Sequence, residues 1–294
     1  MEKVSLYIPC YNAQMYLQEC LEGILRQTYQ IDEVLLIDDG STDATLTIAR
    51  NYPVKIISYG ENRGLAAARN TAFRQSRNEF VAALDADCLA HPGWLEELMR
   101  CLANEDIAAS GGMLLEKNNA GLGDRWRCAH MNQSWGQDML YDPPFLYGNN
   151  SVFRKSAVMR AGFYNQGFKT NYEDIDLSEK IYKLGFRMVY DPGAVVEHLR
   201  RDTVGSVFRS FWVRQCYYRN YNELRKKGIA REIAMCIGGI ADYLDIADIF
   251  FREDFRHDDY NLMALDILLA PYCFWKDLKG LFKRFYSPGG LEYD

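Results

Sequence analysis

The sequence predicts an α/β fold, with a mostly parallel central sheet flanked by helices and a helical C-terminal extension. Short apolar, β-branched runs alternate with segments of helical spacing through the first half of the chain. These runs are continuously apolar, which is typical of parallel strands buried on both faces. Near residue 200 the composition shifts to basic and aromatic, with amphipathic segments beyond. We therefore expect an α/β domain at 1–200 and a helical region at 201–294.

Each element of the first half follows from one of these runs. Strands are predicted at 4–9, 33–38, 54–59 and 80–84. Helices are predicted at 13–27, 43–50, 65–76 and 93–102. Because ligands of such sheets bind beyond the carboxyl ends of the strands, the polar residues after each strand are the first candidates for a site.

The second half of the domain is less regular. Strands are predicted at 107–115 and 145–153 and, as a pair, at 188–190 and 194–197. Helices are predicted at 155–161 and 173–184, and Gly185 ends the second of them. The segment 117–144 is rich in Gly, Asn and Trp and is predicted to be a long loop with a short helix. Loops of this length are usually functional or mobile.

The composition argues against several functions. The formal net charge of -6 excludes nucleic-acid binding by the chain as a whole. The longest apolar run, 267–275, contains Pro271 and is far shorter than the ~20 residues that a membrane-spanning helix needs. The eight cysteines are scattered without a C-x-x-C pair, which is typical of reduced thiols in a cytosolic protein and does not indicate a zinc site.

Two carboxylates end the fourth predicted strand. Asp85 and Asp87 follow the buried run 80–84 with one small residue between them. An isolated D-x-D is often a solvated turn, but at a strand end the pair suits a hard cation such as Mg²⁺ or Mn²⁺. Two carboxylates cannot complete an octahedral shell, so this interpretation implies a diphosphate ligand as well.

The ends of the second and third strands carry further candidates. Asp39, in the sequence Asp38-Asp39-Gly40-Ser41, could bind the base or ribose of a nucleoside, or this stretch could simply turn and cap a helix. Gly64, after Asn62 and Arg63, begins a helix whose N–H groups favour phosphate, and Arg69 lies one turn further on. The alternative for Arg69 is an ordinary surface arginine.

Two more features concern proton transfer and metal binding. Glu173 and Asp174 begin a helix, where negative charge is favourable in any case, but there a carboxylate could also take a proton from a hydroxyl group. His198 follows the last strand pair; it is either a structural residue or a third ligand for a metal at Asp87.

A set of motifs occurs in a fixed order between residues 3 and 200: Ile8-Pro9-Cys10-Tyr11-Asn12, Gln27-Thr28, Asp38-Asp39-Gly40-Ser41-Thr42-Asp43, Asn62-Arg63-Gly64, Ala68-Arg69-Asn70, Leu84-Asp85-Ala86-Asp87, Gly148-Asn149-Asn150 and Glu173-Asp174. In order and spacing this set resembles the inverting family 2 glycosyltransferases, which have the GT-A fold. Each motif alone is weak, whereas the ordered set is specific.

The resemblance implies a nucleotide-sugar site. Its residues would be Pro9, Tyr11, Asn12, Asp39, Asn62, Arg69, Asp85, Ala86 and Asn149. Among these, Asp39 would bind the base, which is uracil in many members. Arg69 would lie near the base or diphosphate, and Asp85 near the ribose.

The resemblance also implies the catalytic and metal-binding residues. Asp87, together with His198, would coordinate a divalent cation, Mn²⁺ or Mg²⁺. Asp174 would be the catalytic base and Glu173 would support the site. Asn149, within Gly148-Asn149-Asn150, would form part of the sugar and acceptor wall.

The implied activity is transfer of a sugar, with inversion, from a nucleotide-diphosphate donor, most simply a UDP-sugar. The acceptor would be a hydroxyl of a carbohydrate or a lipid-linked sugar in surface polysaccharide or glycolipid assembly. A sugar-phosphate nucleotidyltransferase is one alternative, but it should carry a Gly-rich loop where this chain reads Cys10-Tyr11-Asn12-Ala13. A non-catalytic nucleotide-sugar-binding protein is another.

The stretch 200–231 interleaves basic and aromatic residues. It is either a solvated helical face packed on the first domain or a peripheral membrane contact, in which Arg and Lys attract anionic lipid and aromatic residues enter the interface. The expected location is cytoplasmic, with possible contact to the inner face of the membrane.

Overall fold

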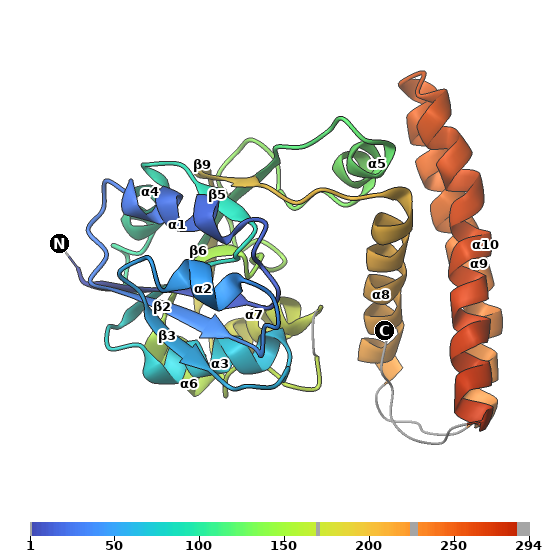
Figure 1. Ribbon diagram of the computed structural model, residues 1–294. Helices are drawn as coiled ribbons and strands as arrows, with labels where there is room; N and C mark the ends of the chain where they lie inside the picture. Colours follow the sequence, from blue (N-terminus) through green and yellow to red (C-terminus); the bar gives the residue numbers. More distant parts are fainter. Residues whose placement is uncertain (1, 169–170, 224–228, 287–294) are drawn as a thin grey trace. The chain divides into compact units, whose positions relative to one another are not determined.

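The computed structural model describes residues 2–168, 171–223 and 229–286, and the side chains at 219–238 and 281–286 lie outside the description. The chain divides by its internal contacts into two units (Figure 1). Unit 1 comprises Met1–Lys117 and Gln133–Arg200, and unit 2 comprises Asn118–Asn132 and Arg201–Asp294. Unit 2 thus contains, besides the expected C-terminal region, a segment from the predicted loop at 117–144.

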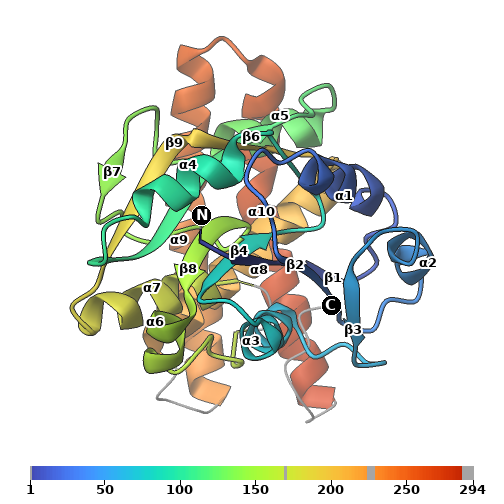
Figure 2. The same ribbon diagram turned by 90° about the vertical axis from the view of Figure 1, so that its left-hand side faces the viewer.

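Unit 1 is built on a nine-stranded mixed sheet (Figure 2). The strand order in the described chain is β3-β2-β1-β4-β8-β6-β9-β5, and β7 pairs with β9. The first four strands are β1 (Val4–Cys10), β2 (Glu33–Asp38), β3 (Lys55–Ser58) and β4 (Phe80–Leu84). They run parallel, as the sequence predicts. Their carboxyl ends therefore lie at one side of the sheet, which we call the carboxyl edge.

The other strands are β5 (Cys88–Ala90), β6 (Ile107–Glu116), β7 (Leu140–Tyr141), β8 (Asn150–Arg154) and β9 (Arg187–His198). Two predictions were wrong here. The strand expected at 145–153 begins only at Asn150, and it runs antiparallel to β4 and β6. The strand pair expected at 188–190 and 194–197 is the single strand β9, parallel to β6, and the short β5 beside it was not predicted.

A bulge explains the misread strand. Along β6 and β9 the pairing passes from Gly112 with Asp191 to Met113 with Val195, so three residues of β9 have no partner on β6 at this point. The Pro-Gly sequence at 192–193 looks like a turn but lies in this bulge. A Cβ at Gly112 would lie 1.9 Å from the carbonyl oxygen of Ala194, so a glycine is needed opposite the bulge.

Helices cover both faces of the sheet. On one face the core is shared with α1 (Leu17–Leu25), α2 (Thr45–Ala49) and α4 (Trp94–Cys101). On the other it is shared with α3 (Leu65–Gln75), α6 (Lys155–Arg160) and α7 (Glu173–Lys183). Successive residues of β1 alternate between the two cores: Leu6 and Ile8 belong to the first and Tyr7 to the second. This two-sided burial is why the strands read as continuous apolar runs.

Unit 2 is helical. Its elements are α5 (Leu122–His130), α8 (Val204–Glu223), α9 (Ile229–Arg256) and α10 (Tyr260–Tyr286), and α9 and α10 run side by side as a hairpin (Figure 1). Trp126 of α5, Phe211 of α8, Tyr243 of α9 and Leu269 of α10 meet in its core. Within the described residues, no helix combines the length and the hydropathy needed to span a bilayer.

Candidate active site

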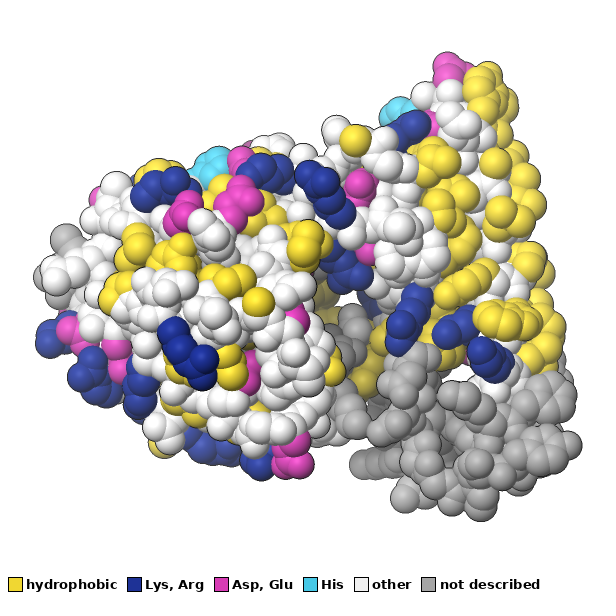
Figure 3. All heavy atoms as spheres, viewed as in Figure 1, with side chains coloured by type: hydrophobic (Ala, Val, Ile, Leu, Met, Phe, Trp, Pro, Cys, Tyr) yellow, Lys and Arg dark blue, Asp and Glu magenta, His cyan; other side chains and the backbone are white. Residues whose placement is uncertain are grey.

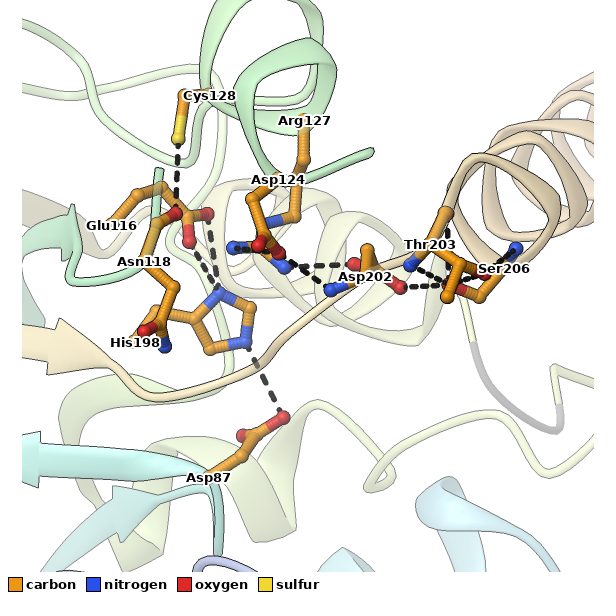
Figure 4. A network of polar contacts seen from close by, with 10 residues as sticks. All are labelled: Asp87, Glu116, Asn118, Asp124, Arg127, Cys128, His198, Asp202, Thr203 and Ser206. Carbon is orange, nitrogen blue, oxygen red and sulfur yellow. Dashed lines mark hydrogen bonds and ion pairs between the residues drawn. The ribbon is translucent and has the colours of Figure 1, made fainter. Parts of the chain in front are cut away.

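A histidine at the carboxyl edge lies between two carboxylates (Figure 4). The Oδ2 atom of Asp87, just after β4, lies 3.3 Å from Nε2 of His198, which ends β9. On the other side of the ring, Nδ1 of His198 lies 2.9 Å from Oε2 of Glu116, which ends β6. Asp87 keeps 30% of its side chain exposed, whereas Glu116 and His198 are nearly buried. The cluster is thus open to solvent only at Asp87.

The charges of these three groups are coupled. Burial by itself would lower the pKa of His198, but its hydrogen bonds and charge interactions with Asp87 and Glu116 prevail and raise the pKa to about 9. Burial raises the pKa of Asp87, and the hydrogen bond and charge of His198 outweigh it, so that the pKa falls below its usual value. At neutral pH the imidazole is therefore protonated and Asp87 is ionised.

The donor atoms suit a divalent cation. Asp87 Oδ2 and His198 Nε2 are 3.3 Å apart, similar to the ~3.0–3.4 Å between neighbouring ligand atoms that each lie ~2.1 Å from one ion. Glu116 on Nδ1 would hold the ring so that Nε2 faces the ion, as carboxylates beside metal-bound histidines do. The ion would take the place of the proton on Nε2.

A buried arginine joins the two acidic motifs. Arg69 of α3 has only 2% of its side chain exposed; its Nη2 lies 3.3 Å from Asp85 Oδ1 and its Nη1 lies 3.1 Å from Glu173 Oε1. A Cβ at Gly148 would lie 1.7 Å from Nη1 of this arginine, so the backbone at Gly148 packs directly on the guanidinium. The motifs that contain Asp85, Gly148 and Glu173 therefore converge on one side chain.

The acidic pair at the start of α7 follows an unusual backbone conformation. Tyr172 has a φ of 73°, which is uncommon for a residue with a Cβ. Burial raises the pKa of Glu173 to about 7; the charge of Asp174 adds to the rise and Arg69 opposes it. Burial also raises the pKa of Asp174, against Arg69 and backbone hydrogen bonds. Because Asp174 is only partly buried and is a stronger base than a free aspartate, it can accept a proton from a bound hydroxyl group.

The loops that follow β1 and β2 are held by their own polar groups. The N–H of Asn12 donates to Ser41 Oγ at 2.9 Å. Asp39 accepts hydrogen bonds from the N–H groups of Arg63 (2.7 Å) and Gly64 (2.8 Å) at the start of α3. Of the helix N–H groups that the sequence suggested for phosphate, that of Gly64 is thus already bonded to Asp39. Burial raises the pKa of Asp39 in spite of these bonds.

The other predicted nucleotide-sugar residues differ in exposure. Tyr11 is 52% exposed and Asn62 is also exposed, so both side chains are accessible to a ligand. Pro9 and Ala86 are buried, so they position the loops around them. Asn149 is buried as well: its Nδ2 donates to Gln133 Oε1 at 2.7 Å, and its Oδ1 has no hydrogen-bond partner among the described residues.

Two residues of the site, Glu116 and Gln133, are not among those predicted from the sequence. Glu116 lies one residue beyond the predicted strand 107–115, so its position at a strand end is the signal that marks it, as for the polar residues after the first four strands. Gln133 lies in the long loop after α5, and no local pattern marks it. Its contact with Asn149 exists only because the loop returns to unit 1 at this residue.

Comparison with known proteins decides the family. The model of glycosyl transferase family 2 matches residues 5–162, more than half of the chain. The chain belongs to glycosyl transferase family 2. An uncharacterized glycosyltransferase of Haemophilus influenzae is 27% identical over 92% of this chain and 85% of its own length. The poly-beta-1,6-N-acetyl-D-glucosamine synthase of Staphylococcus epidermidis is 26% identical over 71% of this chain, which spans only 53% of that synthase.

Solved structures show the same fold. The mannosyltransferase PcManGT from Pyrobaculum calidifontis, in complex with GDP-Man and Mn²⁺, superposes with a TM-score of 0.56 at 20% identity and covers 99% of this chain and 77% of its own. GalNAc-T7 with UDP, GalNAc and Mn²⁺ superposes with a TM-score of 0.57 at 18% identity, over 71% of this chain and 47% of its own. The family 2 chain therefore has the GT-A fold, as the motifs predict. Family membership makes it a glycosyltransferase, not a nucleotidyltransferase.

Proposed function

We propose that the protein transfers a sugar from a nucleotide-diphosphate donor to a hydroxyl acceptor with inversion at the anomeric carbon. Asp87 and His198 would hold Mn²⁺ or Mg²⁺ against the donor's phosphates, and Asp174 would act as the base. The bound cation would supply positive charge to the leaving diphosphate. The two solved neighbours that contain Mn²⁺ support the choice of a divalent cation.

The proposed reaction is one displacement. The acceptor oxygen forms a bond to the anomeric carbon while the bond from that carbon to the diphosphate oxygen breaks. The electron pair of the broken bond leaves with the diphosphate, and Asp174 takes the acceptor's proton. Burial keeps the pKa of Asp174 above its ordinary value, which favours this transfer. No covalent intermediate is needed, so the configuration inverts.

The contact of Arg69 with both Asp85 and Glu173 carries the proposal. Asp85 belongs to the motif of the proposed cation ligand Asp87, and Glu173 precedes the proposed base. One buried guanidinium thus fixes the spacing between the group that would hold the donor and the group that would activate the acceptor. Such fixed spacing is what a transfer between two bound substrates requires.

The donor base is proposed to be uracil, with Asp39 as its partner. The two solved neighbours carry different nucleotides, UDP in one and GDP-mannose in the other, so the fold accommodates both. Tyr11, exposed beside the Asn12 loop, offers a ring on which a base can stack. A thermal-shift comparison of UDP with GDP in the presence of Mn²⁺ tests this assignment, because the nucleotide that binds the folded state raises its melting temperature.

The acceptor is proposed to be a carbohydrate or a lipid-linked sugar of surface polysaccharide assembly, by analogy with the staphylococcal synthase. The stretch 200–231 gives less support to lipid contact than the sequence suggested. Phe208, Phe211, Trp212 and Tyr217 are buried in unit 2, and the part of the stretch beyond residue 218 lies outside the described side chains. Exposed apolar side chains instead occur along α9 and α10 (Figure 3): Leu244, Ile249, Phe255, Ile267, Leu268 and Trp275.

The substitution Asp174→Asn tests the proposed base. It should lower turnover by about 10²–10⁴-fold, since a positioned base contributes that much, and leave binding of UDP with Mn²⁺ unchanged. Asp176→Asn is the matched control: Asp176 lies on the same helix and pairs with Lys180 at 2.6 Å, so its replacement should leave turnover nearly unchanged. Near-native turnover of the Asp174 variant would show that the base is another group.

A further inference from the structure

Unit 2 contains a second histidine between two carboxylates. His130 ends α5, Asp254 lies near the end of α9, and Asp266 lies in the first half of α10. The Nε2 atom of His130 is 3.1 Å from Asp254 Oδ2 and 3.8 Å from Asp266 Oδ1. One ligand atom from each of the three residues lies within 4.8 Å of the other two. Three separate helices therefore present nitrogen and oxygen donors to one point.

This cluster is closed to solvent. The side chains of His130 and Asp266 are 0% exposed and that of Asp254 is 4% exposed. Aromatic rings surround it: Phe250 stacks on the imidazole at 4.1 Å and Trp126 meets it edge-on at 5.1 Å. In such a low-dielectric place an unneutralised carboxylate is costly.

Two buried polar atoms of the cluster, Nδ1 of His130 and Oδ2 of Asp266, have no hydrogen-bond partner among the described residues. Trp126 Nε1 donates to Asp266 Oδ1 at 2.8 Å and so orients this carboxylate. The other oxygen, Oδ2, is buried and has no hydrogen-bond partner in the described chain. Among the described residues, neither Asp254 nor Asp266 forms an ion pair with a lysine or an arginine. Two buried carboxylates thus share one imidazole, which can supply at most one positive charge to the two of them.

We propose that His130, Asp254 and Asp266 bind a divalent transition-metal ion of the zinc class. An imidazole nitrogen and two carboxylate oxygens form a ligand set that Zn²⁺ accepts in proteins. The distances of 3.1 and 3.8 Å between the donor atoms bracket the ~3.3 Å that separates ligand atoms placed ~2.0–2.1 Å from a tetrahedral ion. The ion supplies the missing charge, and Trp126 orients Asp266 as an outer-shell partner.

The ion would have a structural role. It would join α5, which reaches unit 2 from the middle of the chain, to both helices of the α9–α10 hairpin. Unit 2 has no sheet among its described residues, so a link between these three helices would limit how they move against one another. The site is separate from Asp87 and His198 in sequence and in ligands, and it does not depend on the proposed transfer reaction.

Cobalt binding tests the site in the full-length chain. Protein carrying Asp87→Asn, purified in metal-depleted buffer without nucleotide, should bind about one Co²⁺ per chain with visible d–d bands. Zn²⁺ should displace the Co²⁺, remove the bands and raise the melting temperature by about 5 °C or more when in large excess over its Kd. Adding Asp266→Asn or His130→Gln should abolish both effects.

Asp277→Asn is the matched control. Asp277 also lies on α10 and accepts hydrogen bonds from a tryptophan, Trp212 at 2.7 Å, and from Tyr243 at 3.0 Å. It has no histidine in these contacts, so its replacement should leave the cobalt bands intact. If the Asp266 and His130 variants do not fold, the number of Co²⁺ ions bound per chain of the Asp87→Asn protein decides whether the site exists. No Co²⁺ bands and no stabilisation by Zn²⁺ in that protein would overturn the proposal and leave a proton shared by Asp254 and Asp266.

Discussion

Each unit contains a histidine flanked by two carboxylates, yet the two clusters differ in exposure. His198 in unit 1 lies between Glu116 and Asp87, and 30% of the Asp87 side chain is open to solvent. His130 in unit 2 lies beside two carboxylates that are at most 4% exposed. The pKa values move in opposite directions: contacts with its carboxylates raise that of His198 to about 9, whereas burial lowers that of His130.

The contrast shows that residue types alone do not define a role. At the carboxyl edge, Glu116 and Asp87 each form a short contact with the imidazole of His198. Asp87 is partly exposed and can still reach a ligand. In unit 2 every donor atom faces protein, so a small-molecule substrate has no access to the cluster. We therefore expect substitutions in the first cluster to change chemistry and substitutions in the second to change stability.

The largest effect should come from His130→Gln. It removes the imidazole that two buried carboxylates share, and breaking such a buried pair costs about 3–5 kcal/mol. The result should be a marked fall in the midpoint of thermal unfolding, with turnover retained at low temperature. His91→Gln serves as control, because His91 also pairs with a carboxylate, that of Glu197 at 3.3 Å, but is 45% exposed. If the two variants had equal melting temperatures, the greater burial of His130 would make no difference to its contribution to stability.

Asp87→Asn should have nearly as large an effect, but on turnover. Losing the proposed cation ligand removes several kcal/mol of charge stabilisation, or about 10²–10³-fold in rate. Stability should fall less than in the His130 variant, because Asp87 is 30% exposed and His198 keeps its contact with Glu116. Steady-state assays with Mn²⁺ and calorimetry measure the two quantities. Glu61→Gln, an exposed carboxylate paired with Arg63 at 2.9 Å, should change neither.

Glu116→Gln should have an intermediate effect. Replacing an outer-shell carboxylate typically weakens metal affinity about 10–100-fold, because the imidazole is no longer held in one orientation. Titration of Mn²⁺ into protein with UDP, followed calorimetrically, measures the affinity directly. High Mn²⁺ should restore most of the turnover, which it would not do for Asp87→Asn. A turnover loss that Mn²⁺ does not restore would mean that Glu116 acts on folding and not on the ion.

The sequence predicted the carboxyl edge well because parallel strands bring their ends together automatically. Once the runs that became β1, β2 and β4 were recognised, Asn12, Asp39 and Asp87 had to lie near one another. The ordered motifs then identified the family. The family match spans residues 5–162, so Asp174 and His198 lie beyond it, and their roles rest on geometry and resemblance.

The features that the sequence did not predict depend on contacts between residues that are distant in the chain. Because of its bulge, the single strand β9 was predicted as two strands. The bulge is recognised only from the pairing of β9 with β6 at Gly112. The cluster of His130, Asp254 and Asp266 was not predicted for a different reason. His130 and Asp254 are separated by 124 positions, and each looks like an ordinary helical residue in its own segment. The aromatic stretch after residue 200 suggested a surface, whereas its described rings mostly fill a core.

The smallest effect concerns Glu173, which lies beside the proposed base. Burial, and after it the charge of Asp174, raises the pKa of Glu173 to about 7, so Asp174 is already ionised while Glu173 titrates. Because Glu173 is neutral at the lower pH at which Asp174 titrates, Glu173→Gln should leave the acidic limb of the kcat profile unmoved. Glu179→Gln, on the same helix and paired with Lys183 at 3.4 Å, should not move it either. A limb that moves to lower pH only in the Glu173 variant would show that Glu173 carries its charge while Asp174 titrates, the reverse of this order.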